Sequence, residues 1–213
     1  MYFSDRYDAA MQLAPLLEKY KNEKGVILAV PRGGVPIGYY LAKYLDFPLD
    51  LLMTKKLGHP GNEEFAIGAV SLEGSIVEET TGVPEQYIRE ETRRISEQLK
   101  ERYIKFMGNK EPVDIKGKII IVVDDGVATG RTILSTIKIL RNKEPRKIVV
   151  AVPVTSEEAA DRIREVVDDF ICLHTPYPFY GVGRFYADFT QVEDEDVLLL
   201  LNELNARGKV AQS

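Results

Sequence analysis

The sequence has few of the residues that build disulfide-held or zinc-held folds. It contains one cysteine, Cys172, and two histidines, His59 and His174, among 213 residues. A single cysteine excludes a disulfide framework and suits a reducing compartment. Because Cys172 lies in the apolar segment FICL, we interpret it as a core residue. The two histidines are far apart in the chain and lack the spacing of a zinc site.

Basic charge and long apolar runs are also scarce. The net charge of −5 gives no support for binding nucleic acid through a basic surface. The apolar stretches are far shorter than the roughly 20 residues that span a bilayer. The first residues, MYFSDRYDAA, lack the charged and apolar regions of a signal peptide. We therefore expect one soluble domain over residues 1–213, located in the cytoplasm and without a membrane partner.

Short apolar segments alternate with helical patterns along the chain. Strands are expected at five places, residues 25–30, 48–54, 117–123, 147–154 and 169–173. Helical periodicity falls between them, at residues 5–20, about 35–45, 84–106, 131–142 and 157–167. Residues 65–71 and 75–78 have the pattern of a hairpin or of two short strands. This alternation predicts an α/β fold with a central, mostly parallel sheet of about five strands flanked by helices.

The most informative segment is IIIVVDDGVATGRT, residues 119–132. A buried strand ends in Asp124 and Asp125, a loop of small residues follows, and a helix opens near Arg131. Backbone N–H groups converge at such a junction and bind phosphate monoesters. The two carboxylates would repel that phosphate, so they must face hydroxyl groups or a metal. Ribose 5-phosphate, with a phosphate and a vicinal diol, satisfies both halves.

Other phosphate-binding motifs do not match this segment. No Gly-Lys-Ser/Thr follows the loop, which excludes a Walker A motif, and the glycine spacing differs from G-x-G-x-x-G. A simpler interpretation is that one of the acids caps the next helix and the glycines make a tight turn. A cap needs neither two acids nor two threonines, so we favour ligand binding.

Two further segments follow predicted strands. Pro31-Arg32-Gly33-Gly34 comes after VILAV and offers unobstructed N–H groups beside a guanidinium. Lys55 and Lys56 close the strand predicted at 48–54, and only one of them is expected to point inward because strand side chains alternate. Ligands of parallel sheets bind at the carboxyl ends of the strands, so all three segments are expected to share one site. Residues 57–64 are turn formers and predict a mobile loop.

Together these motifs resemble the type I phosphoribosyltransferases. IIIVVDDGVATGRT is similar to the signature of that family for phosphoribosyl pyrophosphate (PRPP), and PRGG to its pyrophosphate loop. The segments DLLMTKKLGHPGNEEFAIGAV and CLHTPYPFYGVGRFYADF resemble a bacterial and archaeal subgroup whose acceptor is poorly defined. The resemblance covers nearly the whole chain. It implies a small hood over the site, formed here by residues 1–20 and 174–190, and a homodimer.

The resemblance also implies a reaction. Members transfer ribose 5-phosphate from PRPP to a nitrogenous acceptor, such as a nucleobase, and release pyrophosphate with the help of Mg²⁺. The catalytic residues would be Arg32, Lys55 or Lys56, Asp124 and Asp125, with the two aspartates influencing the Mg²⁺ shell, directly or through water. The residues implied to bind PRPP are Arg32, Gly33, Gly34, Asp124, Asp125, Gly126, Val127, Ala128, Thr129, Gly130 and Thr132. Residues 57–64 would be a lid.

Two alternatives remain open at this point. A regulatory module that binds PRPP or a nucleotide would keep the same loop without transferase activity. An enzyme with another reaction on ribose phosphates, such as a phosphohydrolase, would also keep it, because fold resemblance does not decide chemistry. The acceptor cannot be read from the sequence.

Overall fold

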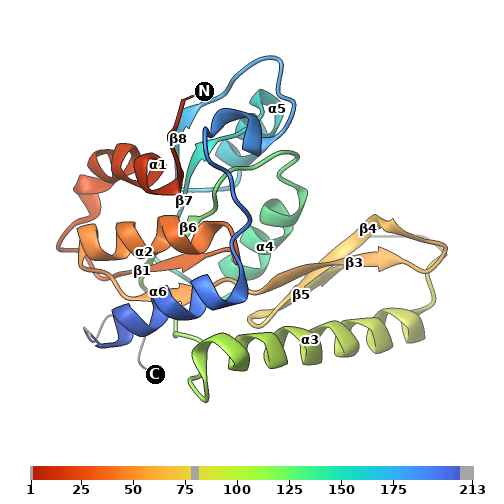
Figure 1. The fold of residues 1–213 in the computed structure, drawn as a ribbon. Helices are drawn as coiled ribbons and strands as arrows, with labels where there is room; N and C mark the ends of the chain where they lie inside the picture. The colour runs from red at the N-terminus through yellow and green to blue at the C-terminus, as the bar shows by residue number, and fades with distance from the viewer. Residues whose placement is uncertain (1, 78–81, 207–213) are drawn as a thin grey trace.

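A parallel sheet of five strands forms the centre of the computed structural model, which describes residues 2–77 and 82–206 (Figure 1). The strand order is β2-β1-β6-β7-β8, and every neighbouring pair is parallel. The bounds are Gly25–Ala29 for β1, Leu49–Leu51 for β2, Ile119–Val123 for β6, Lys147–Val154 for β7 and Asp169–His174 for β8. The predicted fold class and number of strands are confirmed.

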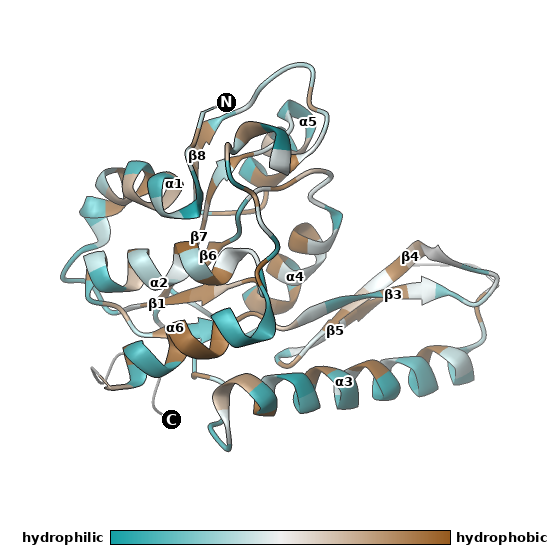
Figure 2. Cartoon of the chain, viewed as in Figure 1, coloured by the Kyte–Doolittle hydropathy of each residue, from teal (hydrophilic) through white to brown (hydrophobic). Residues whose placement is uncertain are grey.

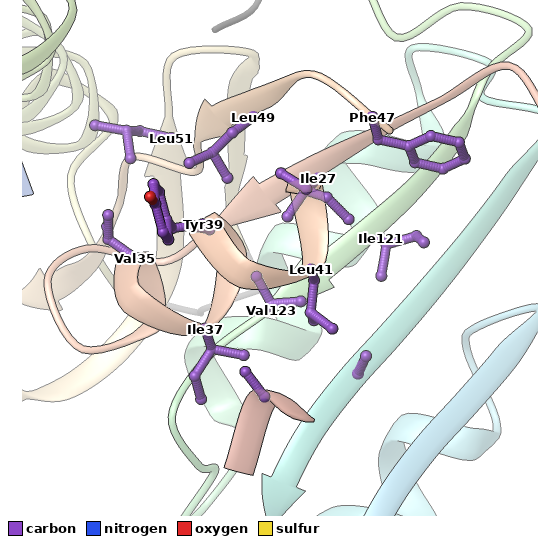
Figure 3. Packing of buried hydrophobic residues seen from close by; sticks show 14 of the residues in the cluster. Ile27, Val35, Ile37, Tyr39, Leu41, Phe47, Leu49, Leu51, Ile121 and Val123 are labelled. Carbon is purple, nitrogen blue, oxygen red and sulfur yellow. The ribbon is translucent and has the colours of Figure 1, made fainter. Parts of the chain in front are cut away.

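Helices cover both faces of this sheet, because its strands are apolar on both sides. Ile119, Ile121 and Val123 belong to one buried cluster, whereas Ile120 and Val122 belong to the other. The first cluster includes residues from α1 (Arg6–Leu13), the 3₁₀ helix Ala14–Tyr20, α2 (Gly34–Leu45) and α6 (Asp194–Ala206). The second includes residues from α4 (Arg131–Arg141) and α5 (Glu157–Arg164). Figure 3 shows the first cluster, where α2 packs against β1 and β6.

A second, antiparallel sheet of three strands projects from the main body together with α3 (Figures 1 and 2). The bounds are Thr54–His59 for β3, Asn62–Ser71 for β4, Gly74–Val77 for β5 and Glu85–Met107 for α3. The hairpin predicted at 65–71 and 75–78 is confirmed as far as residue 77, and residue 78 lies outside the described residues.

The mobile loop predicted at residues 57–64 is wrong. This stretch forms the end of β3, a tight turn at Pro60 and Gly61, and the start of β4. The turn-forming residues therefore lie in a β-hairpin. The pairing of β3 with β4 shifts in register on both sides of Gly58. The strand predicted at 48–54 also ends earlier, at Leu51, so Lys55 and Lys56 lie within β3 rather than at the carboxyl end of β2.

The chain differs from the sequence-based prediction at both ends. The helix expected at 5–20 changes to a 3₁₀ helix at Ala14, because Pro15 cannot donate an α-helical hydrogen bond. Helix α6 was not predicted, although its acidic first turn followed by leucines is a usual helix start. Among the described residues, no helix is long and apolar enough to cross a membrane.

Asp50 is a buried carboxylate that ties three parts of the chain together. The Tyr103 hydroxyl donates to its Oδ1 at 2.8 Å, the Leu51 N–H donates to Oδ1 at 2.7 Å, and the Val113 N–H donates to Oδ2 at 2.8 Å. Burial raises the pKa of Asp50, while these donors favour the ionised form. The contacts anchor α3, and with it the projecting sheet, to β2.

We expect Tyr103→Phe to lower the free energy of unfolding by about 1.5–3 kcal/mol, because it removes a buried donor to a carboxylate. Urea denaturation followed by circular dichroism measures the change. Tyr180→Phe is the matched control, since the Tyr180 side chain is exposed. Equal stability of the two variants would mean that Asp50 is satisfied without Tyr103.

Candidate active site

The carboxyl ends of β1 and β6 lie side by side, which brings two of the predicted segments together. Ala29 pairs with Val123, and the Val30 N–H donates to the Val123 carbonyl at 2.9 Å. The chain then turns into residues 31–34 on one strand and residues 124–130 on the other. The sheet topology therefore places the PRGG loop beside the acidic pair, as the predicted strand pattern requires.

Two glycines allow these loops to approach closely. A Cβ atom on Gly33 would lie 2.1 Å from Asp125 Oδ2, and one on Gly34 would lie 2.7 Å from the Val123 carbonyl oxygen. No larger residue fits at either position without moving the neighbouring loop. Gly33 and Gly34 thus let the backbone of this loop pack directly against Asp124 and Asp125.

In the loop between β6 and α4, Val127 is hydrogen-bonded to the rest of the fold, whereas the two residues after it are exposed to solvent. The Val127 N–H donates to the Val154 carbonyl at 3.0 Å, and its carbonyl accepts from the Thr155 hydroxyl at 2.8 Å. Ala128 and Thr129 are exposed. Val127 is among the residues that the resemblance implies to bind PRPP, and its N–H and carbonyl are both hydrogen-bonded within the fold.

Gly126 is required for packing. A Cβ atom there would lie 2.5 Å from Val182. Gly130, in contrast, has a φ of +70° and immediately precedes α4, where no side chain caps the helix. The cap interpretation of the acidic pair fails for α4, and the first N–H groups of this helix are left for a ligand or water.

The acidic pair is held by residues from both ends of the chain. Arg6 donates to Asp125 Oδ2 through Nε at 3.0 Å and through Nη2 at 2.8 Å, and its guanidinium lies 4.1 Å from the centre of the Phe189 ring. The Tyr186 hydroxyl donates to the Asp125 carbonyl at 2.7 Å. Asp124 Oδ1 accepts from the N–H of Asp125 at 2.8 Å. These contacts fix the position of both carboxylates.

Burial makes the acidic pair costly to ionise. The pKa of Asp124 is raised well above its ordinary value, first by burial and second by the neighbouring Asp125 carboxylate. Burial also raises the pKa of Asp125, although Arg6 opposes that shift. A ligand that donates hydrogen bonds to these oxygens, as a diol does, would stabilise their ionised form.

Arg32 is held by two acids near the start of α6. Its Nη1 lies 3.0 Å from Glu193 Oε2 and 3.3 Å from Asp194 Oδ1, and the peptide bond between Pro31 and Arg32 is cis. Asp194 also contacts Lys105 Nζ at 2.7 Å. An anion that binds Arg32 therefore competes with carboxylates already in place.

Lys55 and Lys56 point to opposite faces of β3, as strand alternation predicts. Lys55 is exposed and donates to Gln98 Oε1 on α3 at 3.1 Å. Lys56 lines a cavity that also contains Thr129 and Thr132 of the phosphate loop. Of the two lysines, Lys56 is the one that lines this cavity.

Sequence patterns did not identify four residues that shape this site, namely Arg6, Tyr186, Glu193 and Asp194. Each lies far from the β6 loop in the sequence. Tyr186 belongs to the segment CLHTPYPFYGVGRFYADF, but that pattern assigns it no contact with the β6 loop. Arg6 falls in the helical pattern at 5–20, where an arginine is usually solvated. Only the tertiary structure reveals its contact with Asp125.

A family model for the phosphoribosyl transferase domain matches residues 7–183. The chain belongs to this family. Among solved structures, TT1426 from Thermus thermophilus is 36% identical, with a TM-score of 0.83 over 95% of this chain and 99% of that chain. A hypothetical protein from Neisseria gonorrhoeae has a TM-score of 0.51 at 18% identity over 97% of this chain and 96% of that chain, which supports the fold alone.

Curated relatives extend the family match. A Mycobacterium tuberculosis protein named "Putative phosphoribosyl transferase" is 35% identical over 205 residues, which cover 94% of this chain and 46% of that protein. A ribose-phosphate pyrophosphokinase of Pyrococcus furiosus is 35% identical over 65 residues, covering 30% of this chain and 23% of that protein. The chain thus spans about half the length of the M. tuberculosis relative.

The donor set of the family site fits a magnesium ion that is shared with its substrate. Mg²⁺ usually takes one or two carboxylates together with water and substrate phosphates, rather than a cage of protein ligands. The carboxylates of Asp124 and Asp125 meet that requirement. Within the described part of the chain, no group of three or more His, Cys, Asp or Glu residues could hold a metal by itself.

We expect Asp124→Asn to stabilise the ligand-free protein, and increasingly so as pH rises above the ordinary carboxyl pKa of 3.8. The folded protein binds the Asp124 proton more tightly than the unfolded chain, whose carboxyl titrates near the ordinary value of 3.8. Wild-type stability therefore falls as pH rises from that value toward the folded pKa, and the amide removes this loss. Each kcal/mol gained raises Tm by about 2–4 °C in a chain of this size.

Thermal unfolding at several pH values measures this effect. Glu97→Gln, on the exposed surface of α3, is the matched control for loss of one acid. Parallel stability profiles for Asp124→Asn and wild type would show that burial does not disfavour the carboxylate.

Proposed function

We propose that this chain transfers the ribose 5-phosphate group of PRPP to a nitrogenous acceptor and releases pyrophosphate. The observation that carries the proposal is the meeting of three features at one sheet edge. These are an uncapped helix N-terminus after a small-residue loop, two partly buried carboxylates at the end of β6, and a glycine loop that lies against Asp125 and carries Arg32. Each feature suits a different part of PRPP.

The phosphate loop suits the 5′-phosphate. Residues 128–132 combine open backbone at Ala128 and Thr129 with the N-terminus of α4, where the helix dipole favours negative charge. Thr129 and Thr132 add hydroxyl donors. Asp124 and Asp125, a few residues earlier in the chain, would accept hydrogen bonds from the ribose hydroxyls.

The other loop suits the pyrophosphate. Because Gly33 and Gly34 have no side chains, this loop lies directly against the acidic pair, and Arg32 supplies a planar cation for phosphate oxygens. Binding would draw Arg32 from Glu193 and Asp194, so part of the interaction energy offsets those ion pairs. Lys56, on the adjoining β-hairpin, is the second cation that we assign to the leaving group.

The reaction depends mainly on electrostatic stabilisation of the charges that develop in the transition state. Breaking the bond to pyrophosphate develops positive charge on the ribose ring and negative charge on the leaving group. Asp124 and Asp125 would hold the ring and stabilise its charge, while Arg32 and Lys56 stabilise the leaving group. A Mg²⁺ ion, when bound with PRPP, adds positive charge at the pyrophosphate oxygens.

Arg6 would couple the acidic pair to the acceptor side of the site. Arg6 forms an ion pair with Asp125. Just before Arg6 in the chain, residues 2–4 form backbone hydrogen bonds with residues 185–188; for example, the Ala187 N–H donates to the Phe3 carbonyl at 2.8 Å. Tyr2 stacks on His174 with ring centres 4.1 Å apart. This joined segment supports the hood predicted from residues 1–20 and 174–190, which would cover the acceptor.

The relatives' names support the proposal but do not identify the acceptor substrate. One is named as a phosphoribosyl transferase and another as a ribose-phosphate pyrophosphokinase, both of which concern phosphorylated ribose. The identity of the acceptor is not assigned, because no sequence motif marks the residues of the hood that would contact a base.

Pyrophosphate release measures the proposed activity directly. The protein is incubated with PRPP, Mg²⁺ and a panel of purine and pyrimidine bases, with and without each base. We expect release that depends on one class of base, and we expect Asp125→Asn to reduce PRPP affinity about tenfold to a hundredfold, since a charge-assisted hydrogen bond is worth about 1.5–3 kcal/mol. Tight PRPP binding without release for any base would instead indicate a regulatory PRPP-binding module.

Two variants test the cations assigned to the leaving group. We expect Arg32→Ala and Lys56→Ala each to lower kcat/KM for PRPP about tenfold to a hundredfold while the Kd of ribose 5-phosphate stays within about twofold. Lys55→Ala is the matched control, because Lys55 points to Gln98 on α3. Equal loss of affinity for ribose 5-phosphate and PRPP in Arg32→Ala would contradict a pyrophosphate role.

A further inference from the structure

A cavity of about 760 Å³ opens from the phosphate loop and continues along α4, between the β3–β4 hairpin and α5. Thr129 and Thr132 lie where it meets the loop, while Lys138, Arg162 and Val166 line it farther along α4 and α5. A 5′-phosphate held at residues 128–132 does not need this extension. The volume is within the range of about 300–1,000 Å³ of small-molecule sites.

The walls of this cavity carry an excess of positive charge. Lys56, Arg131, Lys138 and Arg162 line it, whereas Glu165 is the single acidic residue among the lining residues whose side chains the structure describes. Arg162 contacts Glu158 at 2.6 Å. Arg131 and Lys138 form no ion pair with any residue that the structure describes, so their charges are available to an anion.

The position of Arg131 adds an independent argument. It is the first residue of α4, a helix with no acid in its first turn and no side-chain cap. A cation at a helix N-terminus is repelled by the helix dipole, which favours anions there. Arg131, Ser135 and Lys138 follow at spacings of four and three residues and so share one face of α4. That face presents positive charge along the cavity.

Apolar residues in the lining argue against a purely ionic role. Phe65, which is 55% exposed, contributes an aromatic ring, and Leu134 and Val166 add apolar surface. Ligand sites of this kind combine an apolar lining with a few convergent polar groups. An aromatic ring beside a row of cations suits a base joined to phosphates better than a free phosphate.

We propose that this cavity is a second ligand site, which binds a nucleoside diphosphate or triphosphate along α4. The phosphates would contact Arg131 and Lys138, and the base would pack on Phe65. The site goes beyond the proposed transferase reaction and does not depend on it, although both use the start of α4. A ligand there would contact β3 and α4 together and so would influence the position of Lys56.

The test uses ADP as the probe and calorimetry as the measurement. ADP is titrated into the full chain that has been saturated with ribose 5-phosphate, so that the phosphate loop is already filled. We expect saturable binding of one ADP per chain. Lys138→Gln should raise the Kd of ADP about tenfold to a hundredfold without changing the Kd of ribose 5-phosphate.

Two further variants sharpen the result. Phe65→Ala should raise the Kd of ADP about tenfold, as loss of base stacking does, and should leave the Kd of inorganic pyrophosphate unchanged. Lys100→Gln, an exposed lysine of α3 outside the cavity, is the matched control. The proposal is overturned if ribose 5-phosphate abolishes ADP binding, if wild type does not bind ADP, or if Lys138→Gln and Lys100→Gln bind it equally.

These outcomes are separate from those of the transferase assay. Failure of base-dependent pyrophosphate release would leave the ADP measurements unaffected. If ribose 5-phosphate itself does not bind, the Kd values of ADP for Lys138→Gln and Lys100→Gln still test whether ADP binds in this cavity.

Discussion

The register between β1 and β6 is the constraint on which the candidate site depends. Their parallel pairing ends at Ala29 and Val123, so the two loops that follow leave the sheet at the same level. Only glycine at positions 33 and 34 allows the first loop to lie against the Val123 carbonyl and the Asp125 carboxylate. A shift of one residue would turn the buried side chains of either strand to the opposite face, which both apolar clusters resist. Core packing therefore sets the geometry of the site.

Charges at this site are neutralised by residues brought from distant parts of the chain. Arg6 contacts Asp125 from the N-terminal segment, and Glu193 and Asp194 contact Arg32 from the start of α6. Without these partners, a buried carboxylate and a half-buried guanidinium would each be costly to keep ionised. Binding of a ligand must exchange these contacts for its own, so affinity reflects the difference between two sets of ion pairs rather than the sum of new ones.

Local patterns predicted most of the central sheet. The strands at 119–123, 147–154 and 169–174 are apolar on both faces and bounded by turn residues, and such runs can be buried only between helices. The prediction of secondary structure failed where the same residue types occur both in loops and in the turns of β-hairpins. Gly58, Pro60 and Gly61 are turn formers, yet they lie in and around a β-hairpin that packs on α3 and α4, and only those long-range contacts favour strand over loop.

The sequence by itself determined the fold class, the phosphate loop and the acidic pair, because each is carried by residues adjacent in the chain. Only the tertiary structure decided that Lys56, rather than Lys55, lines the cavity that reaches the loop after β6, since the direction of a side chain depends on which neighbours its strand contacts. It also decided that the backbone of Val127 is hydrogen-bonded within the fold, that Gly126 packs against Val182, and that Arg6 contacts Asp125 and Asp194 contacts Arg32. Contacts between segments more than a hundred residues apart leave no local pattern, because nothing in the spacing of one segment depends on the other.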